Sequence, residues 1–269
     1  MNVETNSAVQ TARLTRLTRL TRLTRLARVL RLVGHVVVAA GIAGIGYPFM
    51  TPARRRLALQ RWSAKLLLCL SARLTVHGEP PRDGGAAFML AANHVSWLDI
   101  FVINAAVPIR FVAKSEIRGW PLIGWLCVKA DTLFIKRERP RDLARLDGTI
   151  ASALRNGAGI GVFLEGTTTD GREVLPFHSS LLRPAQQANI DVQPVAIQYR
   201  RSDGSICTEA AYDGDKTLLD TLHLMLTQRE IHVQVHFLPP LPTAGVHRKV
   251  LARRTRDVIV QRIYGKNPD

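Results

Sequence analysis

Residues 86–99 read AAFMLAANHVSWLD, and this stretch decides both the fold and the site that the sequence predicts. The apolar run at 86–92 has the length of a buried strand, and a helical pattern begins shortly after it. His94 and Asp99 therefore lie where a strand turns into a helix. A histidine there can act as a general base near neutral pH, and a carboxylate can orient it and stabilise its protonated form. Such a pair suits activation of a hydroxyl for acyl transfer, with no nucleophile supplied by the protein.

The same spacing also has a purely structural interpretation. Ser96 could be the N-cap of the helix and Asp99 its third residue, which is a capping box that requires no catalysis. The two interpretations are compatible, because the Asp99 carboxylate could bind the helix terminus and the His94 ring together. The HxxxxD spacing alone does not decide between them.

Three further sequence blocks follow this pattern along the chain. They are KSEIRGWPLIG at 114–124 with IKR at 135–137, VFLEGT at 162–167 and VQPVAI at 192–197. Together with Asn93, His94 and Asp99, these blocks resemble the signature blocks of the glycerolipid acyltransferases, the family of 1-acyl-glycerol-3-phosphate acyltransferases. The resemblance covers about residues 75–240. Each block alone is weakly specific, whereas four blocks in the family's order are a strong signal.

The resemblance implies a membrane-bound enzyme that transfers a fatty acyl group to a lysolipid hydroxyl, with no metal, no cofactor and no acyl-enzyme intermediate. It implies His94 as the general base, Asp99 as the residue that orients it, and acyl-coenzyme A or acyl carrier protein as the donor. Backbone N–H groups near Gly166, or at the helix N-terminus near Ser96, are candidate donors to the oxyanion. The substrate-binding residues that it implies are Asn93, Ser96, Lys114, Arg137, Glu165, Gly166, Thr167 and Thr168.

The third block departs from the family pattern at two positions. The family usually reads Phe-Pro-Glu-Gly-Thr-Arg, whereas this chain has Leu164 in place of the proline and Thr168 in place of the arginine. The missing arginine would help to hold the phosphate of a glycerol-phosphate acceptor, and a threonine offers no charge. Arg137 and Arg172 are alternative phosphate ligands, because a guanidinium can bind phosphate through two hydrogen bonds.

The acceptor therefore stays open between two lysolipids. EGTTTDG at 165–171, followed by VLPF at 174–177, resembles the branch of the family that acylates lyso-ornithine lipid, which carries no phosphate. The commonest activity of the family converts 1-acyl-glycerol-3-phosphate to phosphatidic acid in phospholipid biosynthesis. We expect that activity, with lyso-ornithine lipid acylation as the alternative. A third interpretation makes the chain a non-catalytic, basic, membrane-tethered binding protein whose His94 and Asp99 only cap a helix.

Positive charge is concentrated at the N-terminus. The net charge is +16, and residues 1–60 contain ten arginines, no lysine and one acidic residue, so this part alone carries +9. Arg-Leu-Thr repeats through 13–26, and an α-helix would spread such arginines around its axis. We expect residues 1–31 to be a low-complexity tail that fluctuates in water and is attracted to anionic lipid. Nucleic acid is not an expected partner, because aromatic side chains are not interleaved with the arginines.

The one long apolar run covers residues 32–50, which is just long enough to span a bilayer. Arginines flank both of its ends, and their excess on the N-terminal side would place the catalytic part outside the cell. Because acyl donors are cytoplasmic, we expect instead a helix that enters the membrane and returns to the cytoplasmic face, paired with an apolar helix at 57–70. Residues 32–72 are thus expected to anchor the chain, as the family resemblance also implies. A buried core helix is the alternative.

Residues 73–269 alternate short apolar runs with helical patterns, which predicts an α/β domain with a mostly parallel central sheet flanked by helices. His94 and Glu165 each follow an expected strand, so they should meet at one edge of the sheet. Cys69, Cys127 and Cys207 form no CxxC pattern, which indicates a reducing compartment and neither a metal site nor a disulfide framework. Strands are expected at 74–77, 86–92, 110–113, 132–135, 159–164, 192–198 and 232–237, and helices at 97–106, 122–129, 141–155, 180–189, 216–227 and 246–263.

Overall fold

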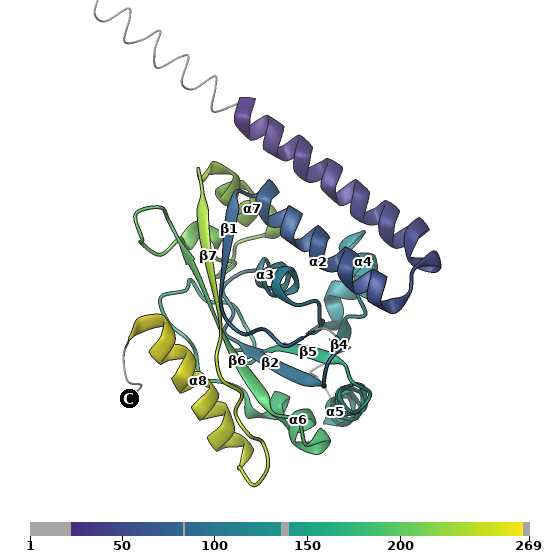
Figure 1. Cartoon of the computed structure of the whole chain (residues 1–269). Helices are drawn as coiled ribbons and strands as arrows, with labels where there is room; N and C mark the ends of the chain where they lie inside the picture. The colour runs from purple at the N-terminus through teal and green to yellow at the C-terminus, as the bar shows by residue number, and fades with distance from the viewer. Residues whose placement is uncertain (1–22, 83, 136–139, 266–269) are drawn as a thin grey trace, which may run out of the picture.

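The computed structural model describes residues 23–82, 84–135 and 140–265. These residues form a seven-stranded sheet with helices on both of its faces (Figure 1). The strand order is β1-β7-β6-β2-β5-β3-β4, and each neighbouring pair is parallel except β6 and β7. The expected α/β fold with a mostly parallel central sheet is therefore confirmed.

Each strand lies within a few residues of its predicted position. The strands are β1 (Ala72–Gly78), β2 (Phe88–Ala92), β3 (Arg110–Lys114), β4 (Leu133–Ile135), β5 (Gly159–Phe163), β6 (Val192–Arg200) and β7 (Ile231–Phe237). The antiparallel pairing of β6 with β7 was not predicted, because apolar runs locate strands and carry no information on their direction.

The helices of the α/β domain also match the predicted ranges, with two additional 3₁₀ turns. The α-helices are α2 (Pro52–Cys69), α3 (Asp99–Ala106), α4 (Ile123–Lys129), α5 (Pro140–Arg155), α6 (Arg183–Ala188), α7 (Leu218–Thr227) and α8 (Arg248–Tyr264). The short turns are η3 (Ser115–Gly119), η4 (Ser179–Leu182) and η5 (Thr208–Ala210), of which η4 lies in the predicted range 180–189 and η3 and η5 were not predicted.

Helices cover the two faces of the sheet because side chains alternate along each strand. In β2, Leu90 and Ala92 pack with α2, α3 and α7 on one face. Met89 and Ala91 of the same strand pack with α5, α6 and α8 on the other. β2 therefore lies in the middle of both apolar layers, and the loop that leaves it is held from both sides.

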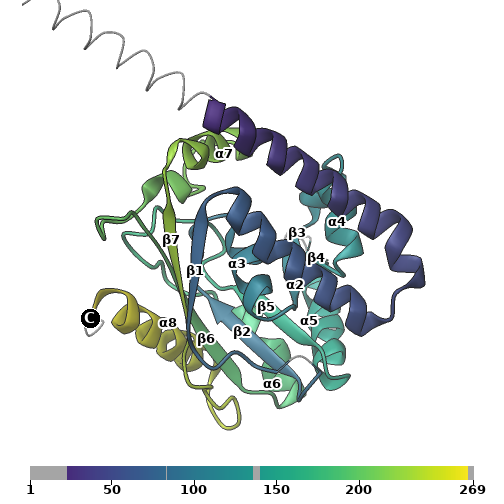
Figure 2. The same cartoon turned by 45° about the horizontal axis from the view of Figure 1, so that its top comes forward.

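The N-terminal helix (Leu23–Phe49) ends in a π turn, η1 (Ile42–Gly46), and a 3₁₀ turn, η2 (Tyr47–Phe49), just before α2 begins. It runs alongside α2 in both views (Figure 2). The rings of His35 and Trp62 stack at 4.7 Å, and each side chain forms a hydrogen bond with the other residue's backbone carbonyl. Arg28 donates to the Gln228 carbonyl at 2.7 Å.

The expected helical pair is thus present, but its first helix starts earlier than residue 32. The boundary placed between residues 31 and 32 falls within one continuous helix, so the tail and the first helix of the pair are not separate there. The rest of the Arg-Leu-Thr repeat, up to residue 22, lies outside the described residues.

Candidate active site

The carboxyl ends of β2 and β5 lie side by side and bring two signature blocks together. The two strands are parallel, with Ala92 opposite Phe163. The residues that follow them meet directly, because the His94 backbone N–H donates to Oε1 of Glu165 at 2.6 Å. The expectation that these blocks share one edge of the sheet is therefore confirmed.

His94 and Asp99 form a hydrogen-bonded pair. His94 Nδ1 lies 2.8 Å from Asp99 Oδ2. The Asp99 side chain is fully buried, whereas the His94 side chain is 19% exposed. An ionised Asp99 holds the imidazole proton on Nδ1, so Nε2 is the basic nitrogen. This arrangement can accept a proton from a substrate hydroxyl.

The Asp99 carboxylate also organises the start of the helix. Its Oδ2 accepts the backbone N–H groups of Val95 at 2.8 Å and Ser96 at 3.0 Å. The prediction that Ser96 is the N-cap is wrong, because a turn intervenes and α3 begins at Asp99 with Leu98 as its N-cap. Ser96 is fully buried, and its Oγ accepts the Leu98 N–H at 3.2 Å. These N–H groups are therefore used within the protein, and the Gly166 N–H donates to the Phe163 carbonyl at 3.4 Å.

Tyr199 is a further member of this cluster that the sequence analysis missed. Its hydroxyl donates to Oδ1 of Asp99 at 2.6 Å. Burial and the nearby Asp99 carboxylate raise the pKa of Tyr199 well above its usual value, so the hydroxyl stays protonated and donates. Val195, Ile197 and Tyr199 alternate along β6 and join the same apolar cluster as α3. That alternation was the signal in the sequence that could have identified Tyr199.

Glu165 joins the catalytic loop to a second loop. Its Oε1 accepts the His94 N–H, and its Oε2 accepts the N–H of Leu175 at 2.7 Å. Burial raises the pKa of Glu165 to about 7, although both hydrogen bonds oppose this rise. Both carboxylate oxygens are thus engaged by backbone groups. Glu165 therefore holds the His94 loop and the Leu175 loop together. Its two oxygens bind the protein backbone and are not directed toward a substrate.

Two more of the predicted substrate ligands are engaged within the protein. The buried Asn93 amide donates to the Ile197 carbonyl at 3.0 Å and accepts the Ile197 N–H at 2.8 Å, which joins the end of β2 to β6. The Thr168 hydroxyl donates to the backbone carbonyl of Tyr212. Both side chains are thus engaged by backbone groups of the protein.

The remaining predicted ligands are more open. Lys114 is exposed at the carboxyl end of β3, on the same edge of the sheet as His94. Gly166 has a φ of +75°, which allows a sharp turn within the third block, and Thr167 beside it is exposed. Arg137 lies outside the described residues.

Aromatic rings and a second loop enclose the His94 ring. The Phe163 ring stacks on His94 at 3.9 Å and on Phe111 at 5.5 Å. Tyr212 donates its backbone N–H to the Val95 carbonyl at 2.9 Å. The stacked Phe163 ring covers one face of the imidazole and helps to fix its plane.

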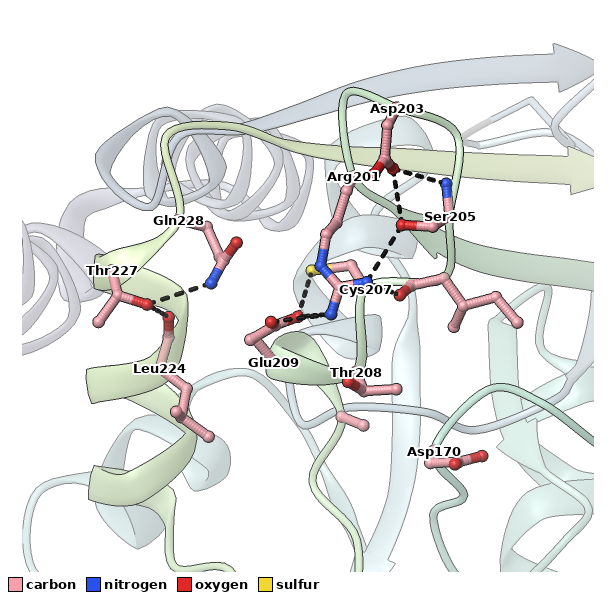
Figure 3. Close-up of polar contacts among 12 residues, drawn as sticks. Asp170, Arg201, Asp203, Ser205, Cys207, Thr208, Glu209, Leu224, Thr227 and Gln228 are labelled. Carbon is pink, nitrogen blue, oxygen red and sulfur yellow. Dashed lines mark hydrogen bonds and ion pairs between the residues drawn. The ribbon is translucent and has the colours of Figure 1, made fainter.

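The loop that follows β6 leads to Tyr212, and polar contacts hold this loop in place (Figure 3). Arg201 Nη2 binds both carboxylate oxygens of Glu209, at 2.8 and 2.7 Å. At the tip of the loop, Asp203 accepts hydrogen bonds from the backbone and the hydroxyl of Ser205. Burial, with help from the nearby Glu209 carboxylate, raises the pKa of Cys207 to about 11. This cysteine is therefore a protonated structural residue and a poor nucleophile.

The C-terminal helix α8 holds the loop that Glu165 binds. Arg256 donates from Nη2 to the Val174 carbonyl at 2.7 Å and from Nε to the Leu175 carbonyl at 3.1 Å. Tyr264 donates its hydroxyl to the Gly171 carbonyl at 3.1 Å. These residues follow the signature blocks by many positions, and nothing in the local sequence distinguishes them from ordinary residues of a basic helix.

Comparison with known proteins decides the family. A family model described as acyltransferase matches residues 73–198. A lyso-ornithine lipid O-acyltransferase of Pseudomonas aeruginosa is 39% identical, over 80% of this chain and 81% of its own length. The chain belongs to the acyltransferase family. It is an enzyme that transfers acyl groups, and the alternative of a non-catalytic binding protein is wrong.

Further relatives of this acyltransferase differ in the acceptor that they are named for. A lyso-ornithine lipid O-acyltransferase of Brucella abortus is 36% identical, over 68% of this chain and 74% of its own length. A 1-acyl-sn-glycerol-3-phosphate acyltransferase of Neisseria meningitidis is 33% identical, over 70% of the chain and 72% of its own length. The crystal structure of the 1-acyl-sn-glycerophosphate acyltransferase PlsC from Thermotoga maritima shares the fold, with a TM-score of 0.61 and 22% identity over 90% of this chain and 97% of that one.

Proposed function

We propose that this acyltransferase transfers a fatty acyl group from acyl-coenzyme A or acyl carrier protein to the hydroxyl of lyso-ornithine lipid. The observation that carries the choice of acceptor is the side chain at position 168. Thr168 is uncharged, and its hydroxyl is already bonded to the Tyr212 carbonyl. Arg172, the nearby candidate for a replacement cation, is paired with Asp170 at 2.5 Å. The part of the site around the third block therefore suits an acceptor without phosphate.

The relatives support the same choice. Those from Pseudomonas aeruginosa and Brucella abortus, at 39% and 36% identity, are both named for lyso-ornithine lipid. This reverses the order in which the sequence analysis placed the two acceptors. 1-Acyl-glycerol-3-phosphate is the second candidate, because the exposed ammonium of Lys114 at the same edge could bind a phosphate.

The proposed reaction uses His94 as the general base. Nε2 accepts the proton of the acceptor hydroxyl as its oxygen attacks the thioester carbonyl, and Asp99 stabilises the imidazolium. The oxyanion of the tetrahedral intermediate requires hydrogen-bond donors at the same edge of the sheet. The intermediate then expels the thiolate, which takes the proton from Nε2. The ester is formed, the thiol is released and His94 returns to its starting state.

We also propose that the N-terminal helix lies in the membrane interface at the cytoplasmic face. By length and composition the helix Leu23–Phe49 could cross a bilayer. One of its sides, however, is packed on the protein, through Arg28 on the end of α7 and through His35 on Trp62 of α2. An amphipathic helix with an apolar outer face suits an interfacial position. The outer face presents Leu23, Leu26, Leu30, Val33, Val37, Ile45 and Phe49.

The experiment that tests the proposed function uses the purified full chain in detergent. Labelled acyl-coenzyme A and acyl carrier protein are each offered with lyso-ornithine lipid and with 1-acyl-glycerol-3-phosphate. We expect transfer to lyso-ornithine lipid, and a loss on the order of 10³-fold or more in a folded His94→Ala variant. Transfer only to the phosphate-bearing acceptor would overturn the proposed acceptor. Equal transfer by His94→Ala would overturn the mechanism.

A further inference from the structure

A cavity of about 230 Å³ lies at the amino ends of the central strands. It is lined by Phe88, Arg110 and Gly159, which lie at the starts of β2, β3 and β5. The catalytic residues follow the opposite, carboxyl ends of β2 and β5. Five residues of strand span roughly 15 Å, so the cavity is separate from the catalytic edge.

The lining of this cavity carries an excess of positive charge. Apart from Arg56, which is engaged by a further contact, Arg55 of α2, Arg110 of β3 and Lys129 of α4 contribute three cations, and Asp131 contributes one carboxylate. The single ion pair among them, between Arg110 and Asp131, is long at 3.5 Å and exposed to solvent. A concave surface lined by charges of one sign concentrates ligands of the opposite sign.

Two of these cations are positioned by neighbouring aromatic residues. Arg55 donates from Nε to the Tyr47 carbonyl at 3.0 Å, and its guanidinium lies 5.5 Å from the centre of the Tyr47 ring. The Lys129 Nζ lies 5.7 Å from the centre of the Trp125 ring. Within the described residues, neither Arg55 nor Lys129 forms a salt bridge.

The mouth of the cavity is kept free of side chains by glycines. Gly84 and Gly157 have φ values of +75° and +84°, which few other residues adopt, and a Cβ at either position would meet no atom within 4 Å. Gly85 also lines the opening. A ligand can therefore approach the backbone of these turns without displacing a side chain.

The cavity lies at the base of the helical pair. Tyr47 and Pro52, on either side of the link between the N-terminal helix and α2, belong to its lining. Ile45 and Phe49, just before this link, are 75% and 84% exposed, and Trp125 and Val128 of α4 are exposed apolar side chains as well. When such side chains enter a bilayer, cations just beneath them lie at the level of the lipid headgroups.

We propose that this cavity binds the phosphate of an anionic phospholipid headgroup. The ligand is a phosphodiester with net negative charge, such as that of phosphatidylglycerol, because the choline ammonium of phosphatidylcholine would be repelled by the Arg55, Arg110 and Lys129 cations. The bound lipid would hold the base of the helical pair on the membrane surface. Its site and the acceptor site lie at opposite ends of the strands, so headgroup binding can be measured without acyl transfer.

The test measures binding of a soluble lipid to the full chain in non-ionic detergent by titration calorimetry. Dihexanoyl phosphatidylglycerol is used below its critical micelle concentration, with dihexanoyl phosphatidylcholine and inorganic phosphate as comparison ligands. We expect an Arg55→Gln/Lys129→Gln variant to bind phosphatidylglycerol at least tenfold more weakly than the wild type. The matched control is Arg253→Gln/Arg254→Gln, which removes the same charge from exposed positions of α8 and should bind unchanged.

Three results would overturn the proposal. Equal weakening in both double variants would show a general effect of net charge. Equally tight binding of phosphatidylcholine would remove the requirement for an anionic lipid, and equally tight binding of inorganic phosphate would make the ligand a free anion. If the Arg55→Gln/Lys129→Gln variant does not fold, Arg110→Gln, at a partly exposed position of the same cavity, is measured in its place and is expected to weaken binding severalfold.

Discussion

The Asp99 carboxylate accepts four hydrogen bonds. Oδ2 binds the His94 ring and the N–H groups of Val95 and Ser96, and Oδ1 binds the Tyr199 hydroxyl. These donors replace the water that a buried carboxylate would otherwise require. The helix-start interpretation and the catalytic interpretation of the HxxxxD spacing are therefore compatible in one residue, because the two oxygens have enough acceptor capacity for both.

Tyr199 is expected to act through Asp99 and not on the substrate. Replacing it by phenylalanine removes one donor to the carboxylate while keeping the ring, so the imidazole is held less firmly. We expect kcat to fall about tenfold with little change in KM, and the free energy of unfolding to fall by about 1–2 kcal/mol. Tyr212→Phe is the control, because the Tyr212 hydroxyl has no hydrogen bond recorded among the described residues. A change in KM alone would contradict this assignment.

Glu165 is expected to make stability depend on pH. Its pKa of about 7 in the folded chain lies above the ordinary 4.5, so its contribution is fully present below pH 4.5 and is lost as the pH rises through 7. The loss corresponds to about 3 kcal/mol. Glu165→Gln cannot ionise, so its Tm relative to the wild type should rise by roughly 5 °C or more between pH 5 and pH 8. A Tm difference that stays constant over this range would contradict the raised pKa of Glu165.

At the scale of elements, the N-terminal helix shows how tertiary contacts override a weak local pattern. Arginines at every third position do not define one face, and Arg25 and Arg31 are indeed exposed. Of Arg25, Arg28 and Arg31, only Arg28 points toward the domain, where it donates to backbone carbonyls just after α7. The helix can therefore continue into the repeat, because Arg28 forms hydrogen bonds with the domain and the other two arginines stay in solvent.

The contact between α8 and the 171–175 loop gives a prediction at this scale. Arg256→Gln replaces a guanidinium that binds two carbonyls by an amide that can reach only one of them, so the loop that holds Glu165 should loosen. We expect kcat/KM to fall about tenfold while the helical content measured by circular dichroism is unchanged. Arg253→Gln removes the same charge from an exposed position of the same helix and should leave activity intact. Comparable losses in the two variants would point to charge and away from the loop.

At the scale of the whole molecule, the apolar outer face of the N-terminal helix and helix α8 lie on opposite sides of the sheet (Figures 1 and 2). The proposed interfacial position of the N-terminal helix therefore predicts one orientation on a membrane, with α8 turned away from the lipid. Phe49→Asp should weaken binding to neutral phosphatidylcholine vesicles at least tenfold, since burying one phenylalanine contributes about 1.5–3 kcal/mol. Cosedimentation measures this, and Gln261→Asp on exposed α8 adds the same charge as a control. Equal binding by both variants would contradict the proposed orientation.

The sequence by itself determined the features that depend on near neighbours. Apolar runs located the strands and helices, and His94 and Asp99 were recognisable as a pair because they lie only five positions apart. The order of the family's four blocks indicated the reaction, since each block is a local string of residues. The sequence left the acceptor open. It shows that Thr168 replaces the family's arginine, but it does not show what the Thr168 hydroxyl binds.

Only the tertiary structure decided which distant residues complete the site. Tyr199 lies 100 positions from Asp99, Glu165 lies 71 from His94, and Arg256 lies 82 from Val174. Periodicity reports which face of an element is apolar, but the order of strands in the sheet sets which faces meet. The position of β7 between β1 and β6, parallel to β1 and antiparallel to β6, depends on that order for the same reason. So does the gathering of cations at the amino ends of the strands.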